Sequence, residues 1–334
     1  MKTVHTSNIY LSSDTGVKGT GTDFEVFLPA EGFTVKDGQS MRLTVQSMLG
    51  AKRFTDVNEY NNKFYIRKQP SEGADWDAED VVYLTKTNHP DHHSLAEDFA
   101  RQITLKCYAN AATGTTRANR NVTSDTISGA DFAGGASFDG KINVDVDIGT
   151  VHAIKVYFRR YFSDQDNTLV DTHLLLGGSN VDTTKHYETD ITKVEDGMEI
   201  SDYADATTEN GVEVRGRTVK IKSIFPAVLR TMTHVYLRSS LVTDNHQNHH
   251  FDSSKYLYDG HVVGSDIMCK APIHPDYFSF DDMNSEKTGY LVNIANRSIT
   301  YLRFVLTTDK DQPLPNAAAH SVELVLRFDI LEQD

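Results

Sequence analysis

The chain has 334 residues, of which 39% are hydrophobic, 24% charged and 10% aromatic, so it can form a packed core and global disorder is excluded. Lys and Arg total 33 against 47 Asp and Glu, a formal net charge of −14 at pH 7. This sign disfavours proteins that neutralise nucleic-acid phosphates or bind anionic membrane surfaces. We therefore expect no direct nucleic-acid sequence recognition.

Targeting and redox signals are few. No segment reaches the roughly 20 consecutive apolar residues of a membrane span, so we expect none. Residues 1–13 lack the apolar stretch of a secretory signal. Two cysteines, Cys107 and Cys269, are too few for a disulfide framework, which indicates a protein made for a reducing cell interior.

Alternation of apolar and polar residues is the dominant pattern along the chain. Such a period of two is typical of strands that are buried on one face. Turn signals such as Asp-Gly and Glu-Gly separate these segments. Many short strands with polar connections predict a mainly β fold, an antiparallel jelly-roll sandwich. The clearest alternating segments are 23–28, 41–46, 219–223 and 321–328.

One segment has helical periodicity instead. The residues from Ser94 to Glu97 have the form of a capping box, in which a hydroxyl and a glutamate pair with free N–H groups at a helix start. The following apolar residues share one face of an amphipathic helix over about Leu95–Asn110. They are Leu95, Phe99, Ile103 and Cys107.

Composition and pattern predict three parts. Residues 1–22 are polar and contain several glycines, which favours an N-terminal arm. Residues 23–70 and 216–334 carry the strands of the jelly-roll framework. Residues 71–215 form an α/β insertion domain that includes the helix and a long Thr-, Gly- and Ala-rich excursion at 111–136.

Fourteen histidines include two clusters in polar loops, each compatible with a solvated loop or with metal ligands. One cluster runs from Asn88 to His93. The other contains His246, His249 and His250, which are the better, though weak, metal candidates. Zinc requires three or four convergent ligands, and neither cluster has the H-E-x-x-H spacing. No nucleophile elbow or other catalytic constellation stands out, so we expect no enzyme and no cofactor.

The order of several segments is familiar. They are Asp23–Pro29, Met41–Val45, Asn61–Ile66, Tyr83–Leu84, Leu174–Gly177, His234–Val242, Ile267–Ile273 and Ile299–Thr307. This succession resembles the penton or minor capsid proteins of small DNA viruses of the double-jelly-roll lineage, namely virophages, polinton-like viruses and the adintovirus group. The resemblance implies a jelly roll with a large insertion, five copies of which close a ring at each icosahedral vertex of the virion.

The resemblance also implies partners. We expect copies of the chain itself, as a pentamer or alternatively a trimer, the major capsid protein, and a host receptor reached through the insertion. Sheet-edge residues near Arg215–Lys222 and Tyr290–Arg303 are expected to supply the two contact patches between copies. Two alternatives stay open: a trimeric head-decoration or fibre protein of a virus, and a carbohydrate-binding β-sandwich, either lectin or glycosidase. The single tryptophan, Trp76, argues against the last.

Overall fold

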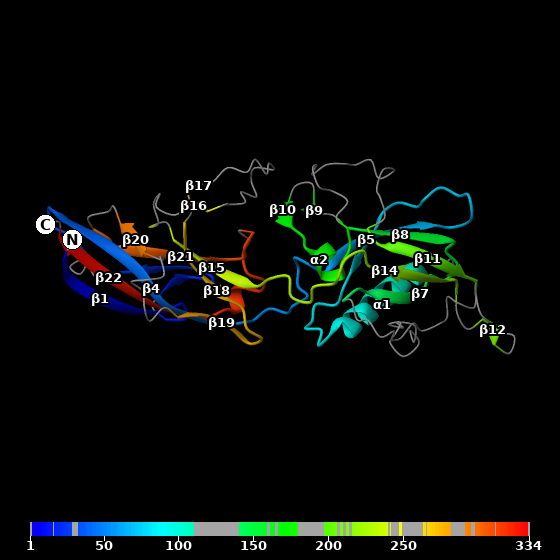
Figure 1. Cartoon of the computed structure of the whole chain (residues 1–334), viewed down its shortest axis with the longest axis horizontal. Coiled ribbons are helices and arrows are strands. Elements are labelled where there is room, and N and C mark those ends of the chain that lie inside the picture. The colour runs from blue at the N-terminus through cyan, green and yellow to red at the C-terminus, as the bar shows by residue number, and fades with distance from the viewer. Residues whose placement is uncertain are drawn as a thin grey trace. The chain divides into compact units, whose positions relative to one another are not determined.

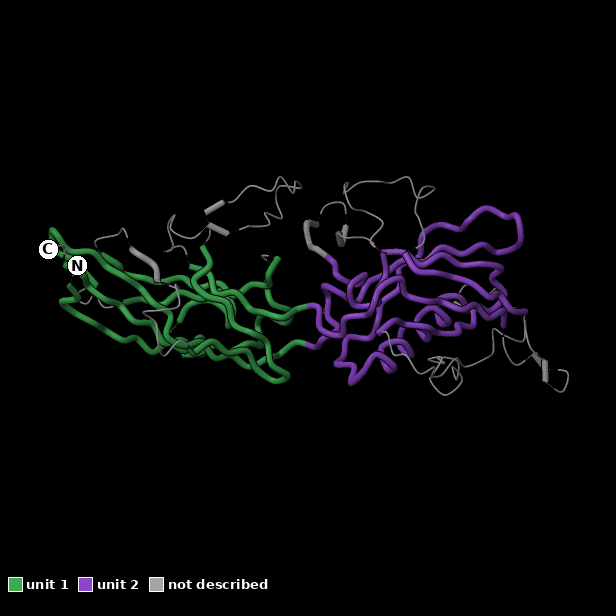
Figure 2. Tube along the Cα trace, viewed as in Figure 1, with its two compact units in different colours: residues 1–54, 232–334 green, residues 55–231 purple. Residues whose placement is uncertain are grey.

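In the computed structural model the chain divides into two compact units (Figure 2). Unit 1 comprises Met1–Phe54 and Met232–Asp334, and unit 2 comprises Thr55–Thr231, so that unit 2 is inserted into unit 1 along the chain. The structure describes the chain except residues 1, 16, 29–32, 110–139, 159–160, 164–165, 180–196, 206–207, 210–211, 214–215, 240, 242–246, 249–262, 265, 282–290, 295–297, 311 and 333–334.

Unit 1 consists mainly of two antiparallel sheets (Figure 1). The first sheet has the order β1-β22-β4-β19, and β20 also pairs with β4; the second has the order β18-β15-β21-β3-β2. A short ribbon of β16 and β17 also belongs to this unit. The strands are β1 (Lys2–Ser12), β2 (Lys18–Gly19), β3 (Asp23–Phe27), β4 (Gln39–Ala51), β15 (His234–Ser239), β16 (Gln247–Asn248), β17 (Val263–Gly264), β18 (Ile267–Pro272), β19 (Tyr277–Asp281), β20 (Leu291–Ile294), β21 (Tyr301–Thr307) and β22 (Val322–Glu332), with a 3-10 turn at Ala317–Ala319.

The strand order of unit 1 is that of a jelly roll. If β1, β3, β4, β15, β18, β19, β21 and β22 are numbered one to eight, the first sheet holds strands one, eight, three and six. The second sheet holds strands five, four, seven and two. The chain therefore passes from one sheet to the other at almost every connection, as in the two Greek keys of a jelly roll. The predicted fold class is confirmed, and unit 2 lies in the connection between β4 and β15.

The interior of unit 1 is filled by apolar side chains from both sheets. Alternate residues of β22, from Val322 to Phe328, point inward and are at most 2% exposed. From the second sheet, Phe24 and Phe304 pack with their ring centroids 5.6 Å apart. Removal of these inward faces from water is the main source of stability for the sandwich.

Unit 2 has a separate apolar core between two three-stranded sheets and a helix. The sheets have the orders β6-β5-β8 and β11-β14-β7, and two short hairpins pair β9 with β10 and β12 with β13. No helix within the described residues is long and apolar enough to cross a membrane. The elements are β5 (Lys63–Gln69), β6 (Asp80–Tyr83), α1 (His92–Ala109), β7 (Asn143–Asp147), β8 (Ala153–Tyr157), β9 (Tyr161–Ser163), β10 (Asp166–Leu169), α2 (Thr172–Leu176), β11 (Glu199–Ala204), β12 (Thr208–Glu209), β13 (Val212–Glu213) and β14 (Thr218–Lys222).

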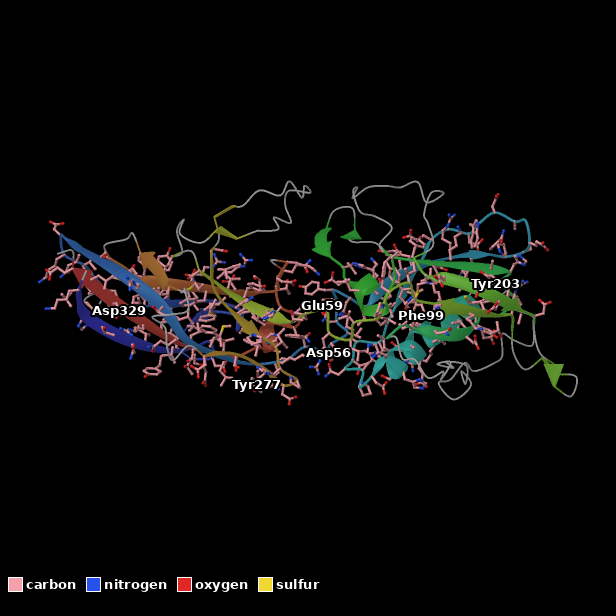
Figure 3. All side chains as sticks on the ribbon, in the orientation of Figure 1. Asp56, Glu59, Phe99, Tyr203, Tyr277 and Asp329 are labelled. Atoms are coloured by element: carbon pink, nitrogen blue, oxygen red, sulfur yellow. The ribbon has the colours of Figure 1, made fainter. Side chains whose placement is uncertain are left out.

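Helix α1 buries the predicted apolar face but begins three residues earlier than expected. Phe99, on this face, is fully buried (Figure 3). Asp91 precedes the helix, and its Oδ1 accepts the backbone N–H of Ser94 at 2.8 Å, which makes Asp91 the N-cap. The predicted capping box is therefore wrong: Ser94 lies inside the helix, and Glu97 pairs with His93 at 3.0 Å.

The boundaries between the units differ from those expected. The expected framework range 23–70 contains β5, and the expected range 216–334 contains β14. In the structure β5 pairs with β6 and β8, and β14 pairs with β7 and β11, so both strands belong to unit 2. The reason is that a period of two identifies a strand but not the sheet that it joins. The excursion at 111–136 lies outside the described residues.

Residues 1–22 do not form a free arm. β1 pairs with β22 from Lys2 opposite Glu332 to Ser12 opposite Glu323. Ile9 and Leu11 pack against the core of unit 1, and this contact fixes the strand at the edge of the first sheet. The other residues of β1 are mostly polar, and Val4 and Tyr10 are exposed, because the strand has only one neighbour.

We predict that Gly50→Ala destabilises unit 1. A Cβ atom at Gly50 would lie 2.1 Å from the ring of Phe278, which is directly opposite on β19 and fully buried. Overpacking of this kind costs about 1–3 kcal/mol, which urea unfolding would measure. Ser47→Ala, in the same strand, serves as the control and should have a much smaller effect. Equal stability of Gly50→Ala and the wild type would contradict this packing.

Candidate functional site

The outer face of the second sheet in unit 1 carries two neighbouring exposed aromatic side chains. Phe27 of β3 and Tyr301 of β21 are opposite one another in the register and are 65% and 52% exposed. Large exposed aromatic residues are enriched where proteins bind one another. Strand alternation places them outward because the residues that alternate with them fill the core: Phe24, Val26, Leu302 and Phe304.

A charged pair borders these aromatic side chains on the same face. Arg303 donates two hydrogen bonds to the carboxylate of Asp23, from Nε at 2.9 Å and from Nη2 at 2.8 Å. These bonds lower the pKa of Asp23 below its ordinary value despite its partial burial. Both side chains are about half exposed, so the pair contributes little stability. Aromatic residues beside a charged rim have the composition of a protein interface.

The two contact ranges expected from the sequence have different outcomes. The range Tyr290–Arg303 contains β20, which pairs only with β4 among the described strands and so lies at a sheet edge. It also contains Tyr301 of β21, which lies between β15 and β3 and offers a sheet face instead. The range Arg215–Lys222 contains β14, which is the central strand of its sheet in unit 2. Both sides of β14 are paired, so this expected edge contact is wrong.

Unit 2 contains a polar pocket of about 340 Å³. It lies where the segment between β6 and α1 passes beside the first turns of the helix. Four residues of α1 line the pocket: Ser94 and the residues three, four and seven positions after it. This spacing places all four on one face of the helix. The lining consists of Thr85, Thr87, Asn88, His89 and Pro90 from the segment and Ser94, Glu97, Asp98 and Arg101 from α1.

Asp98 is the buried acidic group of this pocket. Its carboxylate accepts hydrogen bonds from the N–H of Thr85 at 2.7 Å and from the Thr85 hydroxyl at 2.8 Å. Gln102 donates a third bond at 3.0 Å, and Arg101 donates a fourth. Burial alone would raise the pKa of Asp98, but these bonds outweigh burial and hold the pKa below its ordinary value. Asp98 is therefore ionised and compensates the charge of Arg101.

His89 is held in place by Ser94. The hydroxyl of Ser94 lies 3.1 Å from Nδ1 of His89 and 3.3 Å from the carbonyl oxygen of Asp91. Burial lowers the pKa of His89 below its ordinary value, which favours the neutral ring. In the described structure Nε2 of His89 and Nε of Arg101 are buried without a hydrogen-bond partner.

The predicted histidine ligands do not converge within the described part of the chain. His92 lies 3.1 Å from the carbonyl of Ala227, and His93 pairs with Glu97. No group of three His, Cys, Asp or Glu side chains among the described residues could hold a metal ion. The other candidates lie outside those residues, so a metal site there stays a prediction. They are His246, His249 and His250.

Both cysteines are free and buried in the structure. Cys107 lies on the inner face of α1, and burial raises the pKa of its thiol to about 12. Cys269 is in β18, and burial raises the pKa of its thiol as well. Thiols in such apolar surroundings are unreactive, so neither is a candidate nucleophile.

No protein-family model and no curated protein sequence matches the chain. Among solved structures, the mavirus penton protein is similar with a TM-score of 0.41 and 9% identity, over 97% of this chain and 100% of that protein. A chain of the Sputnik virophage structure is similar with a TM-score of 0.33 and 11% identity, over 96% of this chain and 97% of that one.

We predict that Asp98→Asn destabilises unit 2 in a pH-dependent way. Because folding lowers the pKa of Asp98, its ionised form adds stability above the unfolded pKa of about 3.9, and this is lost as pH falls through the folded pKa. The difference in unfolding free energy from the wild type should be about 1.5–3 kcal/mol at neutral pH and shrink below about pH 4. Urea titrations between pH 7 and 3 measure it.

Asp77→Asn is the matched control, because Asp77 is exposed in the loop between β5 and β6. Its stability difference from the wild type should be small at every pH. A difference for Asp98→Asn that does not change with pH would contradict the assignment of an ionised Asp98.

Proposed function

We propose that this chain is a structural subunit of a virus capsid. The observation that carries the proposal is the jelly-roll strand order of unit 1 together with its apolar interior. Jelly rolls occur in capsid subunits, in lectins and in cupins. Because aromatic and aliphatic side chains fill the sandwich, its outer faces and edges are the surfaces available for function. A subunit that binds neighbours across such surfaces fits this arrangement.

The assembly that we propose is a ring of five copies at an icosahedral vertex of the virion, in contact with the major capsid protein. A cyclic ring joins two different patches of each copy head to tail. Phe27, Tyr301 and the bordering Asp23–Arg303 pair supply one patch. Unit 2 is not needed to complete the jelly roll, and we assign the contact with a host receptor to it.

Alternative functions are distinguished by assembly and binding. A trimer would indicate a head-decoration or fibre protein. A monomer that binds glycans through unit 1 would indicate a lectin or glycosidase. We propose a structural role for the chain and not an enzymatic one.

We predict a pentamer in solution near neutral pH. Five copies of the 37.3 kDa chain give a mass of about 187 kDa, and three give about 112 kDa. Light scattering after size exclusion, over a range of concentrations, distinguishes the two. A trimer would overturn the vertex assignment, and a monomer at every concentration would contradict self-assembly.

We also predict that the double variant Phe27→Ser, Tyr301→Ser abolishes the ring while each copy stays folded, because it removes exposed aromatic contacts without touching the core. The loss should exceed tenfold in the apparent association constant, the scale of interface hot spots. Phe225→Ser is the control, since Phe225 is 56% exposed but belongs to unit 2. An unchanged mass for the double variant would place the contact elsewhere.

A further inference from the structure

We propose that the pocket beside α1 in unit 2 binds a neutral sugar, such as one pyranose unit of a glycan. The pocket, about 340 Å³, is at the small end of the range for ligand sites. Its walls are the Thr85–Pro90 segment and one face of α1. This activity is separate from the proposed assembly, which uses unit 1.

The charges around the pocket disfavour an ionic ligand. The carboxylate of Asp98 compensates the positive charge of Arg101, and Glu97 adds a further acidic group at the rim. An anion would therefore meet the negative charge of Glu97 without a free cation to bind. A cation would find Asp98 already occupied by four hydrogen-bond donors. The remaining class is a neutral polar ligand.

The polar atoms of the pocket require a ligand that both donates and accepts. The lining includes the hydroxyls of Thr85, Thr87 and Ser94 and the amide of Asn88. A hydroxyl and an amide each offer both a donor and an acceptor. A sugar hydroxyl donates and accepts at once, and a pyranose carries several hydroxyls in a fixed arrangement.

The apolar part of the lining also suits a sugar. Pro90 and the ring of His89 border the pocket, and such surfaces pack against the C–H faces of a pyranose ring. Because an aromatic platform of the Trp or Tyr type is absent from the lining, the expected affinity for a single sugar is weak, with a Kd on the order of millimolar.

The test is saturation-transfer NMR of the full chain with glucose, galactose, mannose, fucose and N-acetylglucosamine. We expect at least one of them to bind. Thr87→Tyr and Glu97→Tyr fill the pocket from its two walls, and each should weaken binding by about tenfold or more. Thr150→Tyr is the control, because Thr150 is exposed in the turn between β7 and β8, outside the pocket. Circular dichroism checks the fold of each variant. If one of the two pocket-filling variants unfolds, the test uses the other pocket-filling variant.

Three results would overturn the proposal. One is the absence of binding by every sugar in the panel. Another is sugar binding that survives both pocket-filling variants. The third concerns phosphate, acetate and Ca²⁺, which are tested as ionic probes. If one of these ions binds, Thr87→Tyr abolishes that binding and no sugar binds, the pocket is an ion site. The mass of the assembly should be the same in the pocket-filling variants as in the wild type, so failure of sugar binding is distinguishable from failure of the proposed assembly.

Discussion

The pairing of β4 with β22 is the interaction on which unit 1 depends. The two strands pair from Gly50 opposite Val322 to Gln39 opposite Glu332. β1 then adds to the free side of β22, while β19 and β20 add to β4. The pairing contains one irregularity, where the register passes from Ser47 to Val45 and Gln46 has no partner. One extra residue in a strand reverses which side chains face inward, and without it half of β4 would turn its apolar residues to solvent.

This bulge also explains how far the sequence could predict the fold. The alternation of Met41, Leu43 and Val45 predicts a strand that ends near residue 46, because the phase changes there. The strand continues, and Met48 is the next buried side chain. Fold class was readable because many segments have a period of two. Strand length and sheet membership were not, because a bulge and the choice of neighbour are decided by tertiary packing.

The same limit accounts for the misplaced parts of the chain. β14 has an alternation as clear as that of any framework strand, yet its inward residues Val219 and Ile221 pack into the core of unit 2. β1 was hard to recognise for a different reason, because an edge strand with one neighbour needs few apolar residues. Only Ile9 and Leu11 pack against the core of unit 1, and Tyr10 between them is exposed, so the alternation is short.

The sequence indicates which residues of α1 share the helix face at the pocket, but it does not indicate which of them are buried. The spacing of Ser94, Glu97 and Arg101 places them on one helix face, which the sequence alone indicates. What it does not indicate is that Asp98 turns inward to bind the segment before the helix through Thr85. That contact brings the loop against the helix and forms the two walls of the pocket. A buried carboxylate that is fully paired thus has a structural role, while the hydroxyl and amide groups that line the pocket beside it are the ones offered to a ligand.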